Sequence, residues 1–177
     1  LLLLLLLVLL HSLELGVTDG LVLHLLGIST AIGCDSDASI GYYNRAISLC
    51  EDLGDRASLA SCLTGRGHAG SPYSSLALAG PSMPVEPLSD FEEALRIARE
   101  VRSPADEAWV LWSLGLLYSM QGRYGQALEA CQDSHKIATR IEHGEWMAGS
   151  QAILGHVYVD LLAAEQALDR LGEALPL

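Results

Sequence analysis

Basic side chains are scarce in this sequence. Lys136 is the single lysine, and ten basic residues stand against 22 acidic ones, which gives a formal net charge of -12 over 177 residues. Such a charge repels a phosphate backbone, and no cluster of Lys or Arg interrupts it. We therefore expect no nucleic-acid partner.

The motifs of common enzyme sites are missing as well. There is no G-x-S-x-G elbow, no P-loop, no G-x-G-x-x-G after a strand and no H-E-x-x-H. The four cysteines (Cys34, Cys50, Cys62 and Cys131) form no C-x-x-C pair, and most fall in apolar helical patterns, where cysteine usually acts as a small buried hydrophobe. We expect no catalysis, no cofactor, and a reducing compartment.

The strongest positive signal is internal repetition. Four glycines follow apolar helical patterns and recur at intervals of 40, 48 and 40 residues: Gly27, Gly67, Gly115 and Gly155. The last two copies match further at the same 40-residue offset: Leu114-Gly115-x-x-Tyr118 returns as Leu154-Gly155-x-x-Tyr158, and Ala127-Leu128 returns as Ala167-Leu168. The chain is therefore built from copies of one unit.

Each copy has the pattern of two helices. In the third, apolar residues keep helical spacing on both sides of the turn Gln121-Gly122-Arg123. Equivalent second helices are predicted near 40–53, 88–101 and 165–175, and Ser89-Asp90 looks like the N-cap of the middle one. No segment shows sustained period-two alternation, so the sequence predicts an all-α fold without a sheet.

These residues resemble the tetratricopeptide repeat family. Leu111-x-x-Leu114-Gly115-x-x-Tyr118 is similar to its first-helix signature, and Ala127 follows where the signature has an Ala in the second helix. Tyr42-Tyr43-x-x-Ala46 and Phe91-x-x-Ala94 are similar to its second-helix pattern. The spacing is similar to the long, 40-residue variant of large bacterial signalling and transcription-regulator proteins. The resemblance implies a right-handed α-solenoid of about four antiparallel helix-turn-helix repeats.

The repeats divide the chain as follows. Residues 1–16 are a Leu-rich segment, expected to be the second helix of a truncated preceding repeat; repeat 1 covers 17–55, repeat 2 covers 56–103, repeat 3 covers 104–143, and repeat 4, truncated, covers 144–177. Repeat 2 carries eight extra residues in a Pro-rich loop near 71–87, which is either a spacer or a partner-contacting insertion. Ten leading apolar residues span about 15 Å as a helix, too little to cross a bilayer alone, so we expect no membrane partner.

The resemblance also implies a concave groove lined by the first helices. Its residues in repeat 3 would be Trp109, Trp112, Leu116, Ser119 and Met120, with His68 and His156 at equivalent places in repeats 2 and 4. The alternative is that Trp109 and Trp112 pack against adjacent first helices. Packed helices lie about 8–10 Å apart, too far for histidines of different repeats to share a zinc ion, so we expect no metal site.

The function predicted on this basis is that of a protein-protein interaction module, a docking arm of a larger cytoplasmic bacterial regulatory protein. Its groove would hold a protein or peptide, or neighbouring domains of the same chain. Two alternatives stay open. One is the effector-sensing arm of a multidomain ATPase or cyclase, and the other is an exported or membrane-associated envelope scaffold anchored through the Leu-rich segment.

Overall fold

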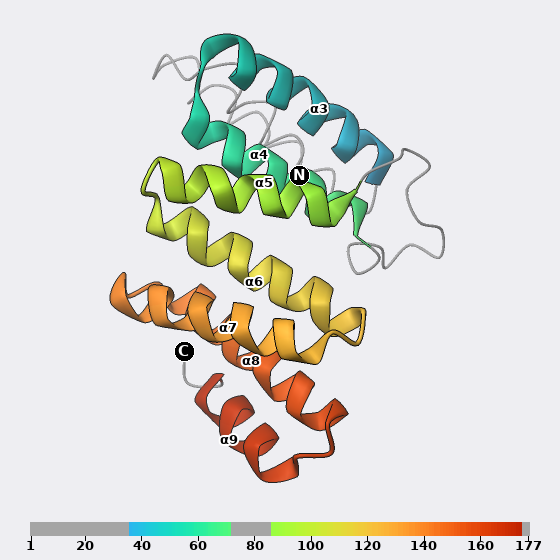
Figure 1. The fold of residues 1–177 in the computed structure, drawn as a ribbon, viewed down its shortest axis with the longest axis vertical. Helices are drawn as coiled ribbons and strands as arrows, with labels where there is room; N and C mark the ends of the chain where they lie inside the picture. Colours follow the sequence, from blue (N-terminus) through green and yellow to red (C-terminus); the bar gives the residue numbers. More distant parts are fainter. Residues whose placement is uncertain (1–35, 72–85, 175–177) are drawn as a thin grey trace, which may run out of the picture. The chain divides into compact units, whose positions relative to one another are not determined.

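The structure, a computed structural model, describes residues 36–71 and 86–174. These residues form seven helices and no strand, which confirms the all-α prediction for this part of the chain (Figure 1). The helices are α3 (Ser36–Leu53), α4 (Arg56–Gly70), α5 (Pro87–Glu100), α6 (Pro104–Met120), α7 (Tyr124–Arg140), α8 (Gly144–Asp160) and α9 (Ala164–Ala174). The Leu-rich segment, Gly27 and most of the Pro-rich loop lie outside the described residues.

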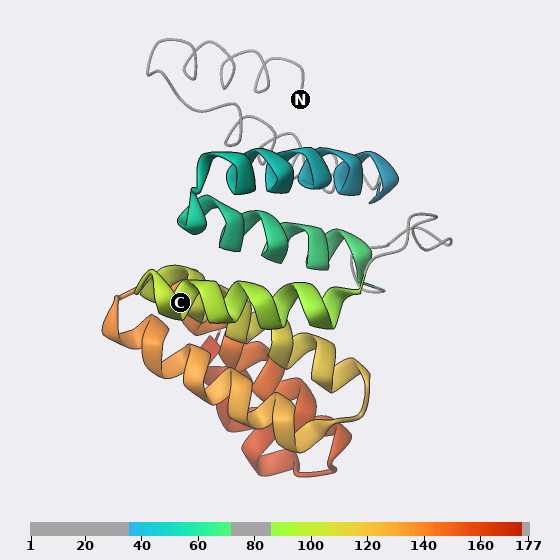
Figure 2. The same ribbon diagram turned by 45° about the horizontal axis from the view of Figure 1, so that its top comes forward.

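Two compact units divide the chain, residues 1–97 and 98–177, and the division falls inside α5. In the first unit α3 packs on α4. In the second unit α6 packs on α7, α7 on α8, and α8 on α9, while α6 also contacts α8 (Figures 1 and 2). This packing of successive helices is that of a helical repeat. None of the described helices is long and apolar enough to span a membrane.

The turns between helices explain the constant spacing. In the second unit each turn has three residues, the middle one with a positive φ: Arg102 (57°), Gly122 (70°), Glu142 (56°) and Leu162 (58°). The next residue donates its amide back to a carbonyl five residues earlier, as Arg123 N does to Tyr118 O at 2.9 Å. This is the Schellman arrangement, which satisfies the last carbonyls of a helix and reverses the chain.

The helix starts are capped by side chains where the sequence offers them. Asp55 accepts a hydrogen bond from Ser58 N at 3.1 Å, and Ser103 accepts one from Asp106 N ahead of Pro104. The prediction of Ser89-Asp90 as an N-cap is wrong, because α5 already begins at Pro87. Asp90 instead lies buried in the first turn, where it meets an arginine of α4.

At the three repeated glycines that the structure describes, the two helices of a copy lie in close contact. An added Cβ would lie 2.2 Å from Cys131 Sγ at Gly115, 2.6 Å from Leu171 Cγ at Gly155, and 2.6 Å from the Phe91 ring at Gly67. A hydrogen bond also joins α6 and α7, because the buried Ser134 hydroxyl donates to the carbonyl oxygen of Ala108 at 2.8 Å. The glycines therefore set the distance between paired helices.

We expect Gly115→Ala to lower the free energy of unfolding by about 1–3 kcal/mol, because the new methyl overlaps the Cys131 sulfur. Gly125→Ala is the matched control in α7, since a Cβ there meets nothing within 4 Å. The control should stabilise by about 0.5–1 kcal/mol. Urea denaturation measures both, and Cys131→Ala should rescue part of the Gly115→Ala loss. Equal effects of the two alanines would contradict the close approach.

A second pair of variants tests the turns. Gly122 and Leu162 occupy the same place in successive copies, and Leu162 holds a positive φ with 91% of its surface exposed. We expect Leu162→Gly to raise the free energy of unfolding by about 0.5–1 kcal/mol through relief of backbone strain, and Gly122→Leu to lower it by about 1 kcal/mol. Thermal melts of the two variants measure the difference. Destabilisation by Leu162→Gly would show that this turn is not strained.

Candidate functional site

The first helices of the third and fourth copies, α6 and α8, meet through an aromatic cluster. Trp109 stacks on Trp146, with ring centroids 5.9 Å apart and planes 12° apart, and His143 stacks on the same indole at 5.0 Å and 7°. Trp112 lies tilted beside it at 5.7 Å. His143 also caps α8, because its Nδ1 accepts a hydrogen bond from Trp146 N. The cluster thus fixes the start of α8 against α6.

Trp112 packs against the backbone of α8 at Gly149 as well as against side chains. Its Nε1 lies 2.9 Å from the position that a Cβ would take on Gly149, so the indole fits against α8 only because that residue is glycine. Trp112 also packs on the buried core cluster of Cys131, Ile153 and Val157. Its side chain therefore joins the two first helices, which is the packing role that the sequence offered as the alternative to ligand contact.

Exposed side chains lie at the C-terminal ends of α6 and α8. Met120 is 50% exposed and Val159 is 51% exposed, and the His156 side chain is 62% exposed. His156 Nδ1 lies 3.8 Å from Asp160 Oδ1 on the same helix. A surface ion pair of this kind contributes little to stability. These four residues form what we call the α6–α8 rim: Met120, His156, Val159 and Asp160.

The other predicted groove residues have different environments. Ser119 is buried at 5% exposure, and Leu116 is partly buried against the core cluster. His68 belongs to the first unit, where its ring meets Phe91 edge-on at 5.4 Å. Burial lowers the pKa of His68 to about 4, so this histidine is neutral at physiological pH. The neighbouring helices α6 and α8 thus carry four of the predicted groove residues: Trp109, Trp112, Met120 and His156. His68 lies on α4 and is not among them.

The predicted repeat-defining residues lie in the interior. Four alanines, Ala46, Ala94, Ala127 and Ala167, are 0–3% exposed. Tyr118 is partly buried and carries the Arg123 guanidinium over its ring, 4.4 Å from the centroid, and Tyr158 packs partly buried on the core cluster. These residues hold the hairpins together and offer little surface to a ligand.

Sequence reasoning missed the partly buried ion pair between α4 and α5. Arg66 donates from Nε to Asp90 Oδ2 at 2.8 Å and from Nη2 to Asp90 Oδ1 at 2.6 Å, and its Nη1 donates to Asn44 Oδ1 of α3. This bidentate geometry ties three helices of the first unit. Two features of the sequence could have predicted this ion pair: Arg66 stands where the helical pattern has an apolar residue, and Asp90 lies near the start of the next helix.

A second polar network was missed in the other unit. Gln151 stands where the family pattern has an apolar residue, and it is 1% exposed. Its Nε2 donates to Glu173 Oε2 at 2.6 Å and lies 3.1 Å from His135 Nε2, so α7, α8 and α9 are joined by one amide. A buried polar group needs such partners. The signal in the sequence was the glutamine itself.

The reactive groups of the described residues have structural surroundings. Burial raises the pKa of the thiols of Cys62 and Cys131 to about 12, so both are protonated hydrophobes at neutral pH. Among residues 36–71 and 86–174, no three His, Cys, Asp or Glu side chains gather in a way that would hold a metal ion.

We expect Trp112→Ala to lower the free energy of unfolding by about 2–4 kcal/mol, because it empties the space between α6 and α8. Met120→Ala on the same helix, which removes a half-exposed side chain, should change it by less than about 0.5 kcal/mol. Denaturant titration followed by tryptophan fluorescence and circular dichroism measures both. An unchanged midpoint for Trp112→Ala would make Trp112 a ligand contact and not a packing residue.

Comparison with known proteins supports the repeat assignment. The sequence model of the tetratricopeptide repeat matches residues 88–140, which cover nearly all of α5 and the whole of α6 and α7. No curated protein matches the chain. The matched segment contains Gly115, Tyr118 and Ala127 in the places that the family pattern requires. Residues 88–140 are thus similar in sequence to the tetratricopeptide repeat family, which supports the assignment of these helices as tetratricopeptide repeats.

Proposed function

We propose that this chain is a docking module that holds an extended or helical segment of a partner protein against the α6–α8 rim. Tetratricopeptide repeats are typically non-catalytic scaffolds that bind proteins or peptides. The observation that carries the proposal is the exposure of Met120 and Val159 at the ends of two first helices that are locked together by the tryptophan cluster. Rigid presentation of apolar side chains lowers the entropy cost of binding.

The charge of the chain indicates which segments would bind. With a formal net charge of -12 and Asp160 in the rim, the surface favours partners that are neutral or basic and carry apolar anchors. An acidic peptide would be repelled. The setting we propose, in line with the 40-residue spacing, is an arm of a larger bacterial regulatory protein that works in the cytoplasm.

Selection from a random peptide display library on the immobilised chain tests the proposal. We expect enrichment of peptides with apolar and basic residues, and we expect the double variant Met120→Asp/Val159→Asp to weaken their binding about tenfold or more. Gln132→Asp is the control, since it adds an acid at an exposed position of α7. The melting temperatures of the rim variant and of the control should both stay close to that of the parent chain. Failure to enrich any peptide, or equal binding by rim and control variants, would refute this role.

A further inference from the structure

The hairpin of α3 and α4 brings two cysteines together. Cys50 lies in the last turn of α3, and Cys62 lies in the middle of α4. Both side chains are buried, with 2% and 1% of their surface exposed, and their thiols are hydrogen-bond partners. Cys131, in the other unit, lies against Gly115. The first unit therefore holds a pair of neighbouring thiols.

The close packing of α3 on α4 makes a bond between the two sulfur atoms possible. An added Cβ on Gly65 of α4 would lie 2.3 Å from the ring of Tyr43 of α3, so the two helices approach closely. Packed helices have axes about 8–10 Å apart and Cα atoms about 2.3 Å from each axis, which puts facing Cα atoms roughly 3–5 Å apart at the closest. A disulfide joins Cα atoms about 4.4–6.8 Å apart. Facing positions of this hairpin fall in that range.

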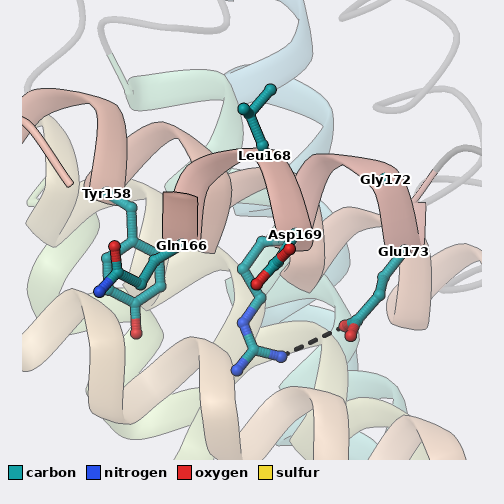
Figure 3. A pocket seen from close by; sticks show the side chains of 7 residues that line it. Tyr158, Gln166, Leu168, Asp169, Gly172 and Glu173 are labelled. Carbon is teal, nitrogen blue, oxygen red and sulfur yellow. Dashed lines mark hydrogen bonds and ion pairs between the residues drawn. The ribbon is translucent and has the colours of Figure 1, made fainter. Parts of the chain in front are cut away.

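A small cavity gives access to one of the two thiols. Its volume is about 240 Å³, and its lining contains the buried side chains of Cys50, Leu59 and Leu63 together with charged residues of α3, α4 and α5. A water molecule takes up about 30 Å³, so a molecule as small as hydrogen peroxide fits beside Cys50. The pocket at α8 and α9 in the second unit, shown in Figure 3, has no thiol among its described lining residues.

The surroundings give the two thiols different chemical roles. Burial raises the pKa of Cys50, and so do the carboxylates of Asp55 and Glu51, whereas the hydrogen bond from the Cys62 thiol acts in the opposite direction because it stabilises the Cys50 thiolate. Burial, first, and the neighbouring Cys50 raise the pKa of Cys62 to about 12. Cys62 therefore stays protonated, and Cys50 ionises first and is the nucleophile of the pair.

We propose that Cys50 and Cys62 form a reversible disulfide when a small peroxide enters the cavity beside Cys50. The Cys50 thiolate attacks one peroxide oxygen, the O–O bond breaks, and a sulfenic acid and hydroxide form. The Cys62 sulfur then attacks the Cys50 sulfur and expels the sulfenic oxygen, which leaves as water with the Cys62 proton. Two thiols are oxidised and one hydrogen peroxide is reduced to two waters. The new bond ties α3 to α4.

Peptide mapping of the full chain tests the proposal. The reduced chain is treated with hydrogen peroxide, its remaining thiols are alkylated, and trypsin is added. Trypsin cuts after Arg56, which lies between the two cysteines, so Cys50 and Cys62 fall in the separate peptides 46–56 and 57–66. We expect mass spectrometry to find these peptides joined, with the loss of two hydrogens, and to find them separate again after treatment with dithiothreitol.

Cys131 is the internal comparison, because burial raises its pKa to about 12 and it has no part in the pair. It should stay reduced where the pair is half oxidised. In Cys62→Ser the reaction should stop at the Cys50 sulfenic acid, which dimedone labels. Oxidation should also raise the melting temperature of the parent chain by about 3 °C or more, and not that of Cys62→Ser.

Three results would overturn the proposal. The first is oxidation of Cys131 as fast as that of Cys50, and the second is a disulfide from Cys50 to Cys34 or to another chain in place of Cys62. The third is an oxidised parent chain that melts no higher than the reduced one, because a bond between α3 and α4 restricts the unfolded chain.

Discussion

The close approach of two helices at a buried glycine is the constraint on which each hairpin depends. At Gly115 and Gly155 the partner side chain lies sixteen residues further on, and at Gly67 the partner Phe91 lies twenty-four residues further on, yet an added Cβ would clash in all three. The extra eight residues of the second copy therefore leave the contact in place. A side chain larger than hydrogen would push the pair apart and loosen every contact that the pair makes with its neighbours.

The two first helices of the second unit, α6 and α8, meet in a different way. Tryptophan side chains fill the space between them, and Gly149 admits Trp112 against the backbone of α8. What stays accessible is the rim, where Met120 and Val159 are half exposed. The aromatic cluster thus packs α6 against α8 beside this rim.

Residues in equivalent places of the register have different surroundings. Leu128 and Leu168 are equivalent in sequence, but the first packs on α8 and the second is 72% exposed. The same kind of side chain is packed in one place and exposed in the other. In repeat proteins each unit buries its face only against its neighbours.

The sequence by itself determined the helices, the turn at Gly122 and the places of the repeated glycines, because periodicity and a 40-residue register are local properties of the chain. The tetratricopeptide assignment followed from the same residues. The tertiary structure alone decided that Arg66 binds Asp90, that Ser119 is buried and that Trp112 packs on Gly149. Each of these depends on which neighbouring helix a side chain meets, and a pattern within one helix does not contain that information.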